Sequence, residues 1–365
     1  MPVPVADPRR GVVAFRAQLD AALARVLDGG RFVLGPEHDL FEAEFARYLG
    51  ASHCIGLASG TEALELALRS VERRGRDDWI VAAANAGFYA SAAAHLAGMR
   101  VRYTDVDPET LTLSAATVEP ELTPETRAVV VTHLYGVLAD VEPIAELCRS
   151  RGIPLVEDCA QAHGARRDGR MAGTFGDVAA FSFYPTKNLP ALGDAGAIVT
   201  NDDGIAERVR RLRQYGWEAK YRVTTFCGRN SRLDELQAAI LRVRLPHLDA
   251  WNERRRAIVS RYSEALAPDA GRMVALDGED YVAHLAVLLA AERDAVRSRL
   301  HAAEIGTDVH YPISDHRQPL WGEKLLAAVR LPVTEHAAEH VLTLPCFPEL
   351  TDDEVDRVCE VLREL

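Results

Sequence analysis

Apolar residues near the start of the chain recur every three or four positions, which is the period of a helix with one buried face. In the first such stretch they are Val12, Phe15, Leu19 and Leu23, and Gly29-Gly30 ends it. A second stretch follows Gly35-Pro36 and repeats the pattern. The sequence therefore predicts one helix over residues 8–28 and another that begins near residue 36.

Short apolar runs dominate the next part of the chain. They are CIGLA (54–58), WIVAA (79–83), VRYTDV (101–106), RAVVVTHL (127–134), IPLVED (153–158), VAAFSFY (178–184) and GAIVT (196–200). Turns or helix-like stretches separate them. Strands that alternate with helices predict an α/β sandwich with a largely parallel, buried sheet.

The pattern changes after about residue 235, where long helical stretches dominate, with an interruption at Pro246. One long apolar run (281–290) follows, then a helix over 292–306, and a last helix begins near Thr351 and Glu354, which have capping-box spacing. We expect a large domain over residues 30–240 and a smaller α+β domain over 241–365, completed by the N-terminal helix 8–28.

Composition narrows the function classes. The 365 residues carry a formal charge of 42 − 54 = −12, which argues against general binding to nucleic acid or to anionic membranes. The six cysteines form no CxxC pair, so we expect free thiols and neither a disulfide framework nor a zinc site. The first residues lack a signal-peptide pattern and no run is long enough for a membrane span, so we expect a soluble cytoplasmic protein.

Four short stretches fall at the ends of predicted strands, where open α/β sheets place their sites. Ser59-Gly60-Thr61 begins a helix whose free N–H groups could bind an anion, or Ser59 and Glu62 simply form a capping box. Glu157 and Asp158 end a buried strand, where a carboxylate needs a cation, a helix to cap or an arginine.

The third stretch, FSFYPTKNLPALGDAGAIVT (181–200), places Lys187 among aromatic and apolar residues. This lysine either extends out of a surface turn or is desolvated and acts as a nucleophile. A fourth stretch, GRNSRLDELQAAI (228–240), offers Asn230 or Ser231 as helix caps. Together, an anion-binding helix start, an acid, a lysine and a nearby serine match the requirements of pyridoxal phosphate.

The chain resembles the DegT/DnrJ/EryC1/StrS sugar aminotransferases, which are fold type I pyridoxal-phosphate enzymes. The resemblance spans nearly the whole chain and is carried by ASGTEAL, DVDPETL, THLYG, VEDCAQAHGA, FSFYPTKNLPALGDAGAIVTND, NSRLDELQAAILRVRLPHLDAWNERRR, VHYPIS and LPCFPELTDDE. It implies a three-layer sandwich with a mainly parallel central sheet and a smaller α+β C-terminal domain.

The resemblance also implies roles for individual residues. Lys187 would hold pyridoxal 5′-phosphate covalently and move protons, Asp158 would pair with the ring nitrogen, and Gln161 would lie near the ring hydroxyl. Phosphate contacts would come from Gly60, Thr61 and Ser182, and from Asn230 of a neighbouring subunit, which implies a homodimer with shared active sites. Substrate contacts would come from Tyr184, Lys220, His310 and Tyr311.

One departure concerns the aromatic residue that packs on the cofactor ring in relatives. Alignment of AAANAGFYASAAAHLAG (82–98) places Gly87 at that position. Phe88 or Tyr89 is therefore expected to take over this contact, unless either is ordinary core. Two smaller departures, Pro190 and Ser59, remove no catalytic group.

The implied function is transfer of an amino group from an amino acid, expected to be L-glutamate, to a nucleotide-linked keto-6-deoxysugar, with dTDP as the expected nucleotide. The motifs do not distinguish C3 from C4 amination, nor a dimer from a higher oligomer. Three alternatives stay open: an aminotransferase for a cyclitol or another ketone, a cofactor-binding regulatory protein without turnover, and a structural oligomer. Retention of Lys187 argues against the related dehydratases, which have histidine there.

Overall fold

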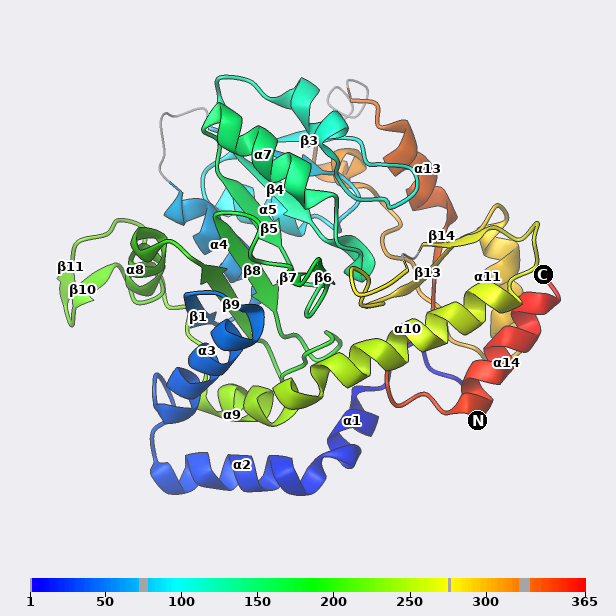
Figure 1. Ribbon diagram of the computed structural model, residues 1–365, viewed down its shortest axis with the longest axis horizontal. Helices are drawn as coiled ribbons and strands as arrows, with labels where there is room; N and C mark the ends of the chain where they lie inside the picture. Colours follow the sequence, from blue (N-terminus) through cyan, green and yellow to red (C-terminus); the bar gives the residue numbers. More distant parts are fainter. Residues whose placement is uncertain (1, 72–77, 275–276, 322–328) are drawn as a thin grey trace.

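The computed structural model describes residues 2–71, 78–274, 277–321 and 329–365, and all seven predicted strands form one sheet (Figure 1). These strands are β1 (His53–Leu57), β2 (Trp79–Ala83), β3 (Arg100–Thr104), β4 (Thr126–Thr132), β5 (Leu155–Asp158), β8 (Val178–Ser182) and β9 (Gly196–Thr200). Their order is β1-β9-β8-β5-β4-β2-β3, and within this sheet β9 alone runs antiparallel to its neighbours. The prediction of a largely parallel sheet is confirmed.

Helices cover both faces of this sheet. On β4, Ala128 and Val130 face one core and Val129 and Val131 face the other, as the two-residue period of a strand requires. The first core contains residues of α4 (Gly60–Ser70), α5 (Tyr89–Leu96) and α8 (Asp203–Leu212). The second contains residues of α3 (Pro36–Leu49), α7 (Val141–Arg151) and α9 (Glu235–Arg244). The result is the expected three-layer sandwich.

The N-terminal helix is divided in two. α1 (Pro8–Ala14) and α2 (Arg16–Gly29) meet at Phe15, whose φ of −113° and ψ of 18° lie outside the helical range. The Phe15 ring packs against His247 and Trp251, with centroids 4.7 and 5.5 Å away. This tertiary contact, which helical spacing does not encode, coincides with the break. The interruption near Pro246 is confirmed: η3 (Leu245–His247) separates α9 from α10 (Leu248–Ala265).

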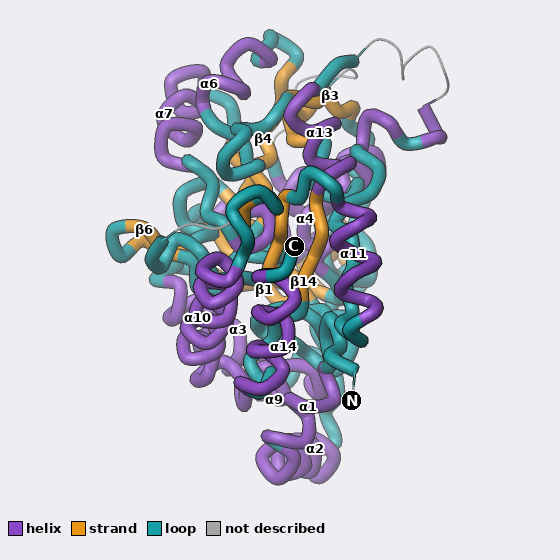
Figure 2. The backbone as a smooth tube through the Cα atoms, turned by 90° about the vertical axis from the view of Figure 1, so that its right-hand side faces the viewer, coloured by secondary structure: helices purple, strands orange, loops and turns teal. Residues whose placement is uncertain are grey.

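A second, antiparallel sheet lies in the C-terminal part, with the order β12 (Arg272–Val274), β13 (Ala286–Leu289) and β14 (Val341–Leu344). It packs with α10, α11 (Arg293–Ala302) and α14 (Asp352–Arg363), which lie beside it in Figure 2. α13 (Pro332–His340) precedes β14. The predicted capping box of Thr351 and Glu354 is present at the start of α14.

The N-terminal segment contacts both parts of the molecule. Val3 belongs to the C-terminal core, whereas Ala22 and Val26 of α2 pack against Ala239 of α9. Because one segment packs against both parts, these contacts do not define where one domain ends and the other begins. The domain boundary at residue 240 stays a prediction.

Several short elements complete the fold. They are α6 (Ala115–Val118), β6 (Arg166–Arg167), β7 (Arg170–Met171), β10 (Trp217–Ala219), β11 (Arg222–Val223), η1 (Glu119–Glu121), η2 (Leu134–Gly136), η4 (Asp315–Arg317) and η5 (Pro319–Trp321). The β10–β11 hairpin projects away from the body of the molecule, at the left of Figure 1. Within the described ranges, no helix combines the length and apolar character that crossing a membrane requires.

Candidate active site

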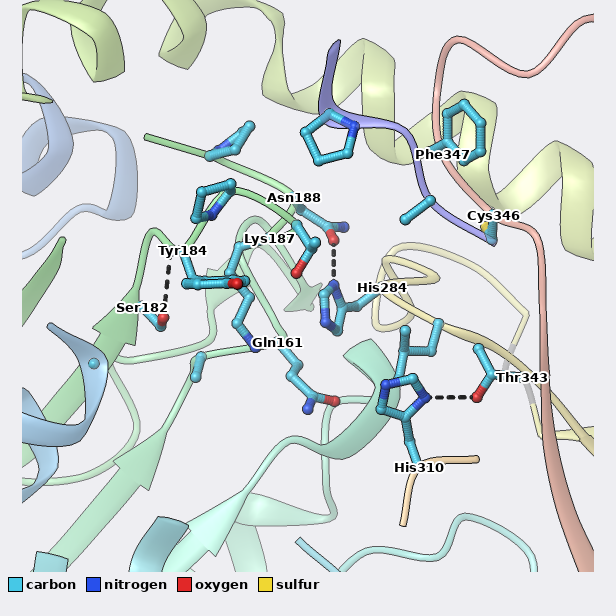
Figure 3. Close-up of a pocket in the computed structure, with 18 of the residues that line it drawn as sticks. Gln161, Ser182, Tyr184, Lys187, Asn188, His284, His310, Thr343, Cys346 and Phe347 are labelled. Atoms are coloured by element: carbon cyan, nitrogen blue, oxygen red, sulfur yellow. Dashed lines mark hydrogen bonds between the residues drawn. The ribbon is translucent and has the colours of Figure 1, made fainter. Parts of the chain in front are cut away.

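A cavity of about 710 Å³ opens where β4, β5 and β8 end. The last residues of these strands, Thr132, Asp158 and Ser182, all line it, which is the position expected for a site in an open α/β sheet. The C-terminal part supplies a further wall through His284, His310 and Thr343, and Figure 3 shows these side chains around Lys187. The cavity therefore brings together segments that are far apart in the sequence.

Lys187 lies in the loop that joins β8 to β9. Phe183 closes this loop by donating from its N–H to the carbonyl of Ala195 (2.8 Å) and accepting from the N–H of Ala191 (2.7 Å). Burial lowers the pKa of Lys187 to about 8, although the carboxylate of Asp158 acts in the opposite direction. By exposed area Lys187 is only partly buried, because it lines an open cavity, whereas protein atoms surround its amine closely enough to desolvate it.

Asp158 is buried at the end of β5. One carboxylate oxygen accepts from the N–H of Ala160 (3.1 Å) and the other from the hydroxyl of Thr132 (3.2 Å), while burial raises the pKa of the carboxyl. No cationic side chain in the described ranges forms an ion pair with it. Burial of a charged carboxylate costs free energy unless a cation lies near it. A cationic group bound in the cavity would therefore stabilise the charged form of Asp158.

The start of α4 forms another wall. Ser59 caps the helix by accepting from the N–H of Glu62 (3.2 Å), which confirms the serine cap, but the reciprocal half of the predicted capping box does not form. The carboxylate of Glu62 turns to Ser231 and Arg229 instead of Ser59, at 2.6 and 3.0 Å. A helix start beside a serine hydroxyl suits an anion such as phosphate.

Gly60 lies against Ser182 at this helix start. A Cβ at position 60 would lie 2.4 Å from the Cβ of Ser182, so only glycine allows the two segments to approach this closely. Gly60, Thr61 and Ser182 all line the cavity, and their role as phosphate contacts stays a prediction.

Gln161 connects the two walls. Its Oε1 accepts from the N–H of Tyr135 (2.6 Å), which fixes the orientation of the amide, and its Nε2 donates to the phenol oxygen of Tyr311 (3.2 Å). The Tyr135 hydroxyl donates to the carbonyl of His310 (2.5 Å), and Nδ1 of His310 lies 2.8 Å from the hydroxyl of Thr343. These bonds hold His310 and Tyr311 at the cavity.

A buried hydrogen-bond network next to Lys187 was not predicted from the sequence. The amide nitrogen of Asn188 donates to the carbonyl of Val282 (2.9 Å) and to Asn252 (2.8 Å). Because a carbonyl can only accept, the amide oxygen of Asn188 faces Nδ1 of His284 (2.9 Å), which must be the donor. Burial also lowers the pKa of His284, so its ring is neutral and Nε2 is an acceptor. In the sequence, the one local indication of this network is a histidine, His284, inside the apolar run 281–290.

The structure brings most, but not all, of the predicted residues together. Those that line the cavity are Gly60, Thr61, Tyr89, Asp158, Gln161, Ser182, Tyr184, Lys187, His310 and Tyr311. Phe88 lies elsewhere, because its ring packs against His95 and Trp321. Lys220, in the turn between β10 and β11, and the exposed Asn230 also lie outside the lining. Asn230 and Ser231 do not cap α9, whose N-cap is Asp234.

The donor set fits pyridoxal phosphate. The cavity offers an amine of lowered pKa, a buried acid that forms no direct ion pair with a described side chain and a helix start beside a hydroxyl. These would complement an aldehyde, a protonated ring nitrogen and a phosphate, respectively.

Known proteins show the same architecture. The chain is 45% identical, over 96% of its length and 95% of the other, to the dTDP-3-amino-3,4,6-trideoxy-alpha-D-glucose transaminase of Micromonospora megalomicea subsp. nigra. It is similar to the crystal structure of S. venezuelae DesV in complex with a ketimine intermediate (TM-score 0.94, 43% identity, 100% and 98% coverage). It is also similar to NtdA from Bacillus subtilis with bound PMP (TM-score 0.92, 30% identity, 100% and 85% coverage).

The sequence profile of one family matches residues 14–363, nearly the whole chain. That match and the similarity over full-length relatives agree with the geometry of the cavity. The chain belongs to the DegT/DnrJ/EryC1/StrS aminotransferase family.

Proposed function

We propose that this chain is a pyridoxal-phosphate-dependent sugar aminotransferase. It moves an amino group from L-glutamate to a nucleotide-linked keto-6-deoxysugar and leaves the 2-oxo acid. The observation that carries the proposal is the placement of Lys187, with its lowered pKa, in one cavity with the buried Asp158.

Each residue has a defined task in this proposal. Lys187 holds the cofactor covalently, Asp158 keeps the ring nitrogen protonated, and Gly60, Thr61 and Ser182 bind the phosphate. When bound, pyridoxal phosphate supplies an aldehyde that accepts the amino group and a ring that withdraws electrons from the reacting carbon. With a pKa near 8, the amine of Lys187 can accept and return a proton at Nζ at physiological pH.

The substrate assignment rests on the relatives and on the size of the cavity. The relative at 45% identity is named for a dTDP-linked 3-amino sugar, so we propose dTDP as the nucleotide and C3 as the position of amination. A cavity of about 710 Å³ is within the range of pockets for small molecules. Tyr184, His310 and Tyr311 lie on its wall, where they would contact the sugar nucleotide.

We also propose a homodimer with shared active sites. Support comes from the segment around the β10–β11 hairpin, which exposes apolar side chains that a monomer would leave in water: Tyr215, Tyr221, Val223 and Phe226. Lys220 and Asn230 belong to the same segment and lie outside the cavity of their own chain. In a dimer they would complete the partner's site.

Hydride trapping tests the covalent attachment. Lysine occurs at only three positions of the sequence, 187, 220 and 324. Borohydride reduction of the protein loaded with pyridoxal 5′-phosphate, followed by peptide mass spectrometry, should label Lys187. A label confined to Lys220 or Lys324, or none at all, would refute the proposal. Lys187→Arg keeps a cation and should abolish the label.

A substrate panel tests the reaction. The protein is incubated with glutamate and with 3-keto or 4-keto deoxysugars linked to dTDP or UDP, and the product masses are measured. A mass for the amino sugar from the dTDP-linked 3-keto substrate supports the assignment. Amination of the 4-keto sugar alone would move the position to C4. No conversion of the cofactor with any amino acid would instead favour the regulatory interpretation.

Subunit complementation tests the shared sites. Lys187→Ala and Asn230→Ala are each expected to be impaired alone. When the two variants are co-expressed, hybrid dimers form. Each hybrid dimer would contain one intact site, with Lys187 from one chain and Asn230 from the other. Random pairing predicts recovery of about a quarter of the wild-type activity. No recovery, or a monomer in sedimentation experiments, would refute shared sites.

A further inference from the structure

Gly87 is a position where the chain makes room for a neighbouring ring. Its φ is +74°, a conformation that glycine adopts without strain. A Cβ at this position would lie 2.8 Å from Cε1 and Cζ of Tyr311 and 3.0 Å from its Cδ1. The Tyr311 ring therefore occupies the space in which a side chain at position 87 would begin.

Tyr311 is held there at both ends. Its phenol oxygen accepts from Nε2 of Gln161 (3.2 Å), so the hydroxyl hydrogen is free for another acceptor. Its backbone is fixed through the preceding carbonyl of His310, which accepts from the hydroxyl of Tyr135 (2.5 Å). Tyr135 also donates its N–H to Gln161 (2.6 Å), which closes the set of contacts.

A second set of bonds joins the two segments that carry Tyr311 and Gly87. Asp315 donates its N–H to the carbonyl of Ala84 (2.7 Å), and its carboxylate accepts from the N–H of Phe88 (2.8 Å) and the hydroxyl of Ser91 (2.9 Å). The distance between Gly87 and Tyr311 is therefore set by several hydrogen bonds on either side, and does not depend on one flexible side chain.

The other nearby aromatic residues are placed differently. Phe88 packs against His95 and Trp321, outside the cavity lining. Tyr89 lines the cavity, but the residue is 49% exposed, and its ring meets the Tyr311 ring edge-on, with centroids 6.2 Å apart and planes at 72°. Among these three, Tyr311 is the aromatic ring fixed at the cavity by hydrogen bonds.

Resting on the proposed function, we propose that Tyr311 supplies the aromatic face against which the pyridine ring of the cofactor packs, with Gly87 leaving the space for it. Its bond to Gln161 places it beside a predicted contact of that ring. A flat, electron-poor ring gains from an aromatic neighbour beyond the area buried. Tyr311 was expected to contact the sugar nucleotide, and this role adds the cofactor to its contacts.

The test measures binding of pyridoxamine 5′-phosphate by equilibrium dialysis and by quenching of its fluorescence. This form binds without a bond to Lys187, so no turnover is needed. Tyr311→Leu should raise the dissociation constant about 2–13-fold and relieve the quenching. Tyr311→Phe keeps the aromatic face and should bind with about the wild-type dissociation constant. An unchanged constant in Tyr311→Leu, or an equal or larger loss in Tyr89→Leu alone, would overturn the assignment.

Gly87→Ala provides a second variant that leaves Tyr311 intact. The new Cβ would displace the Tyr311 ring, so weaker binding is expected. Its matched control is Gly30→Ala, because Gly30 also has a positive φ (+64°) but nothing within 4 Å of an added Cβ. Equal binding by the two variants would contradict the inference. Failure of the wild-type protein to bind the cofactor at all would refute the proposed function itself.

Discussion

Lys187 and Asp158 face the same cavity, and each favours the charged form of the other. Asp158 raises the pKa of Lys187 against the larger lowering by burial, and Lys187 lowers the pKa of Asp158 against the larger rise by burial. The two groups are thus coupled through space, although no ion-pair contact joins them directly. This coupling gives a test that does not require the substrate.

Covalent attachment of pyridoxal 5′-phosphate should follow the neutral amine of Lys187. Its rate is expected to rise with pH, with a midpoint near pH 8, and to level off above about pH 9. Asp158→Asn removes the charge that raises the lysine pKa, so the midpoint should move to lower pH. The growth of the cofactor absorbance band, followed between pH 6 and pH 10, measures this. Asp194→Asn is the control, because Asp194 lines the cavity but does not contribute to the pKa shift of Lys187. A midpoint that rises in Asp158→Asn would contradict the coupling.

Glu157 should matter for stability, although it is adjacent to Asp158. Its carboxylate is fully buried and accepts from four donors: the N–H groups of Gly173, Phe175 and Gly176, and Nε2 of His133. Glu157→Gln replaces an acceptor by an amide that must face donors, so unfolding should become easier by about 2–5 kcal/mol. Urea unfolding measures this, with the exposed Glu109→Gln as the control.

The hydrogen bonds of Glu157 also give a reason for its place in a buried group of potential metal ligands. His133, Glu157 and Cys159 place their ligand atoms within 4.8 Å of one another. Because the carboxylate is already engaged, a chelator should leave the stability of the wild-type protein unchanged. A loss of stability on chelation would show that the carboxylate has another task.

Gly60→Ala should weaken cofactor binding. Its Cβ would collide with Ser182, so the helix start and the hydroxyl would be forced apart. We expect the dissociation constant of pyridoxamine 5′-phosphate to rise by at least about tenfold. The reason is that a hydrogen bond to the charged phosphate, which contributes about 1.5–3 kcal/mol, would be lost. Gly29→Ala is the matched control, because nothing lies within 4 Å of a Cβ there. Similar dissociation constants for the two variants would contradict this role of the Gly60–Ser182 contact.

Asp315 should make stability depend on pH. Burial raises its pKa to about 7, so the folded chain binds a proton that the unfolded chain has released between about pH 4 and pH 7. Stability should therefore fall as the pH rises through this window, by up to about 4 kcal/mol. Asp315→Asn keeps an acceptor for the N–H of Phe88 and should lack this dependence. Urea unfolding at pH 5 and pH 8 compares the two, and equal pH dependence would contradict the prediction.

The sequence predicted the sheet well, and it identified strand-end residues that meet in one cavity. Buried strands appear in the sequence as continuous apolar runs. Polar residues at the ends of these runs, such as Asp158 and Ser182, are therefore easy to recognise. Because parallel strands end at one edge, these residues had to meet. The same logic placed Lys187 beside them, since its loop starts at the end of β8.

Contacts between distant segments could not be predicted in this way. Asn188 meets His284 and Asn252 only after the chain has folded, and no local pattern marks such pairs. Phe88 and Tyr89 are adjacent in the sequence, yet the φ of +69° at Phe88 sends the two rings in different directions. Spacing rules assume regular backbone, so they fail at a turn of this kind.

The crossing of three segments at the end of β8 has a consequence for how this protein can change. Ser182 pairs with Gly196 on β9, and a Cβ at Gly196 would lie 2.4 Å from the carbonyl of Ser59, directly before Gly60. At each of these positions, the size of the side chain is limited by the atoms of the other two segments. Enlarging one residue would demand simultaneous adjustment of its neighbours, whereas the outer loops can vary independently. Redesign of the acceptor range is therefore best directed at the rim, with this junction left intact.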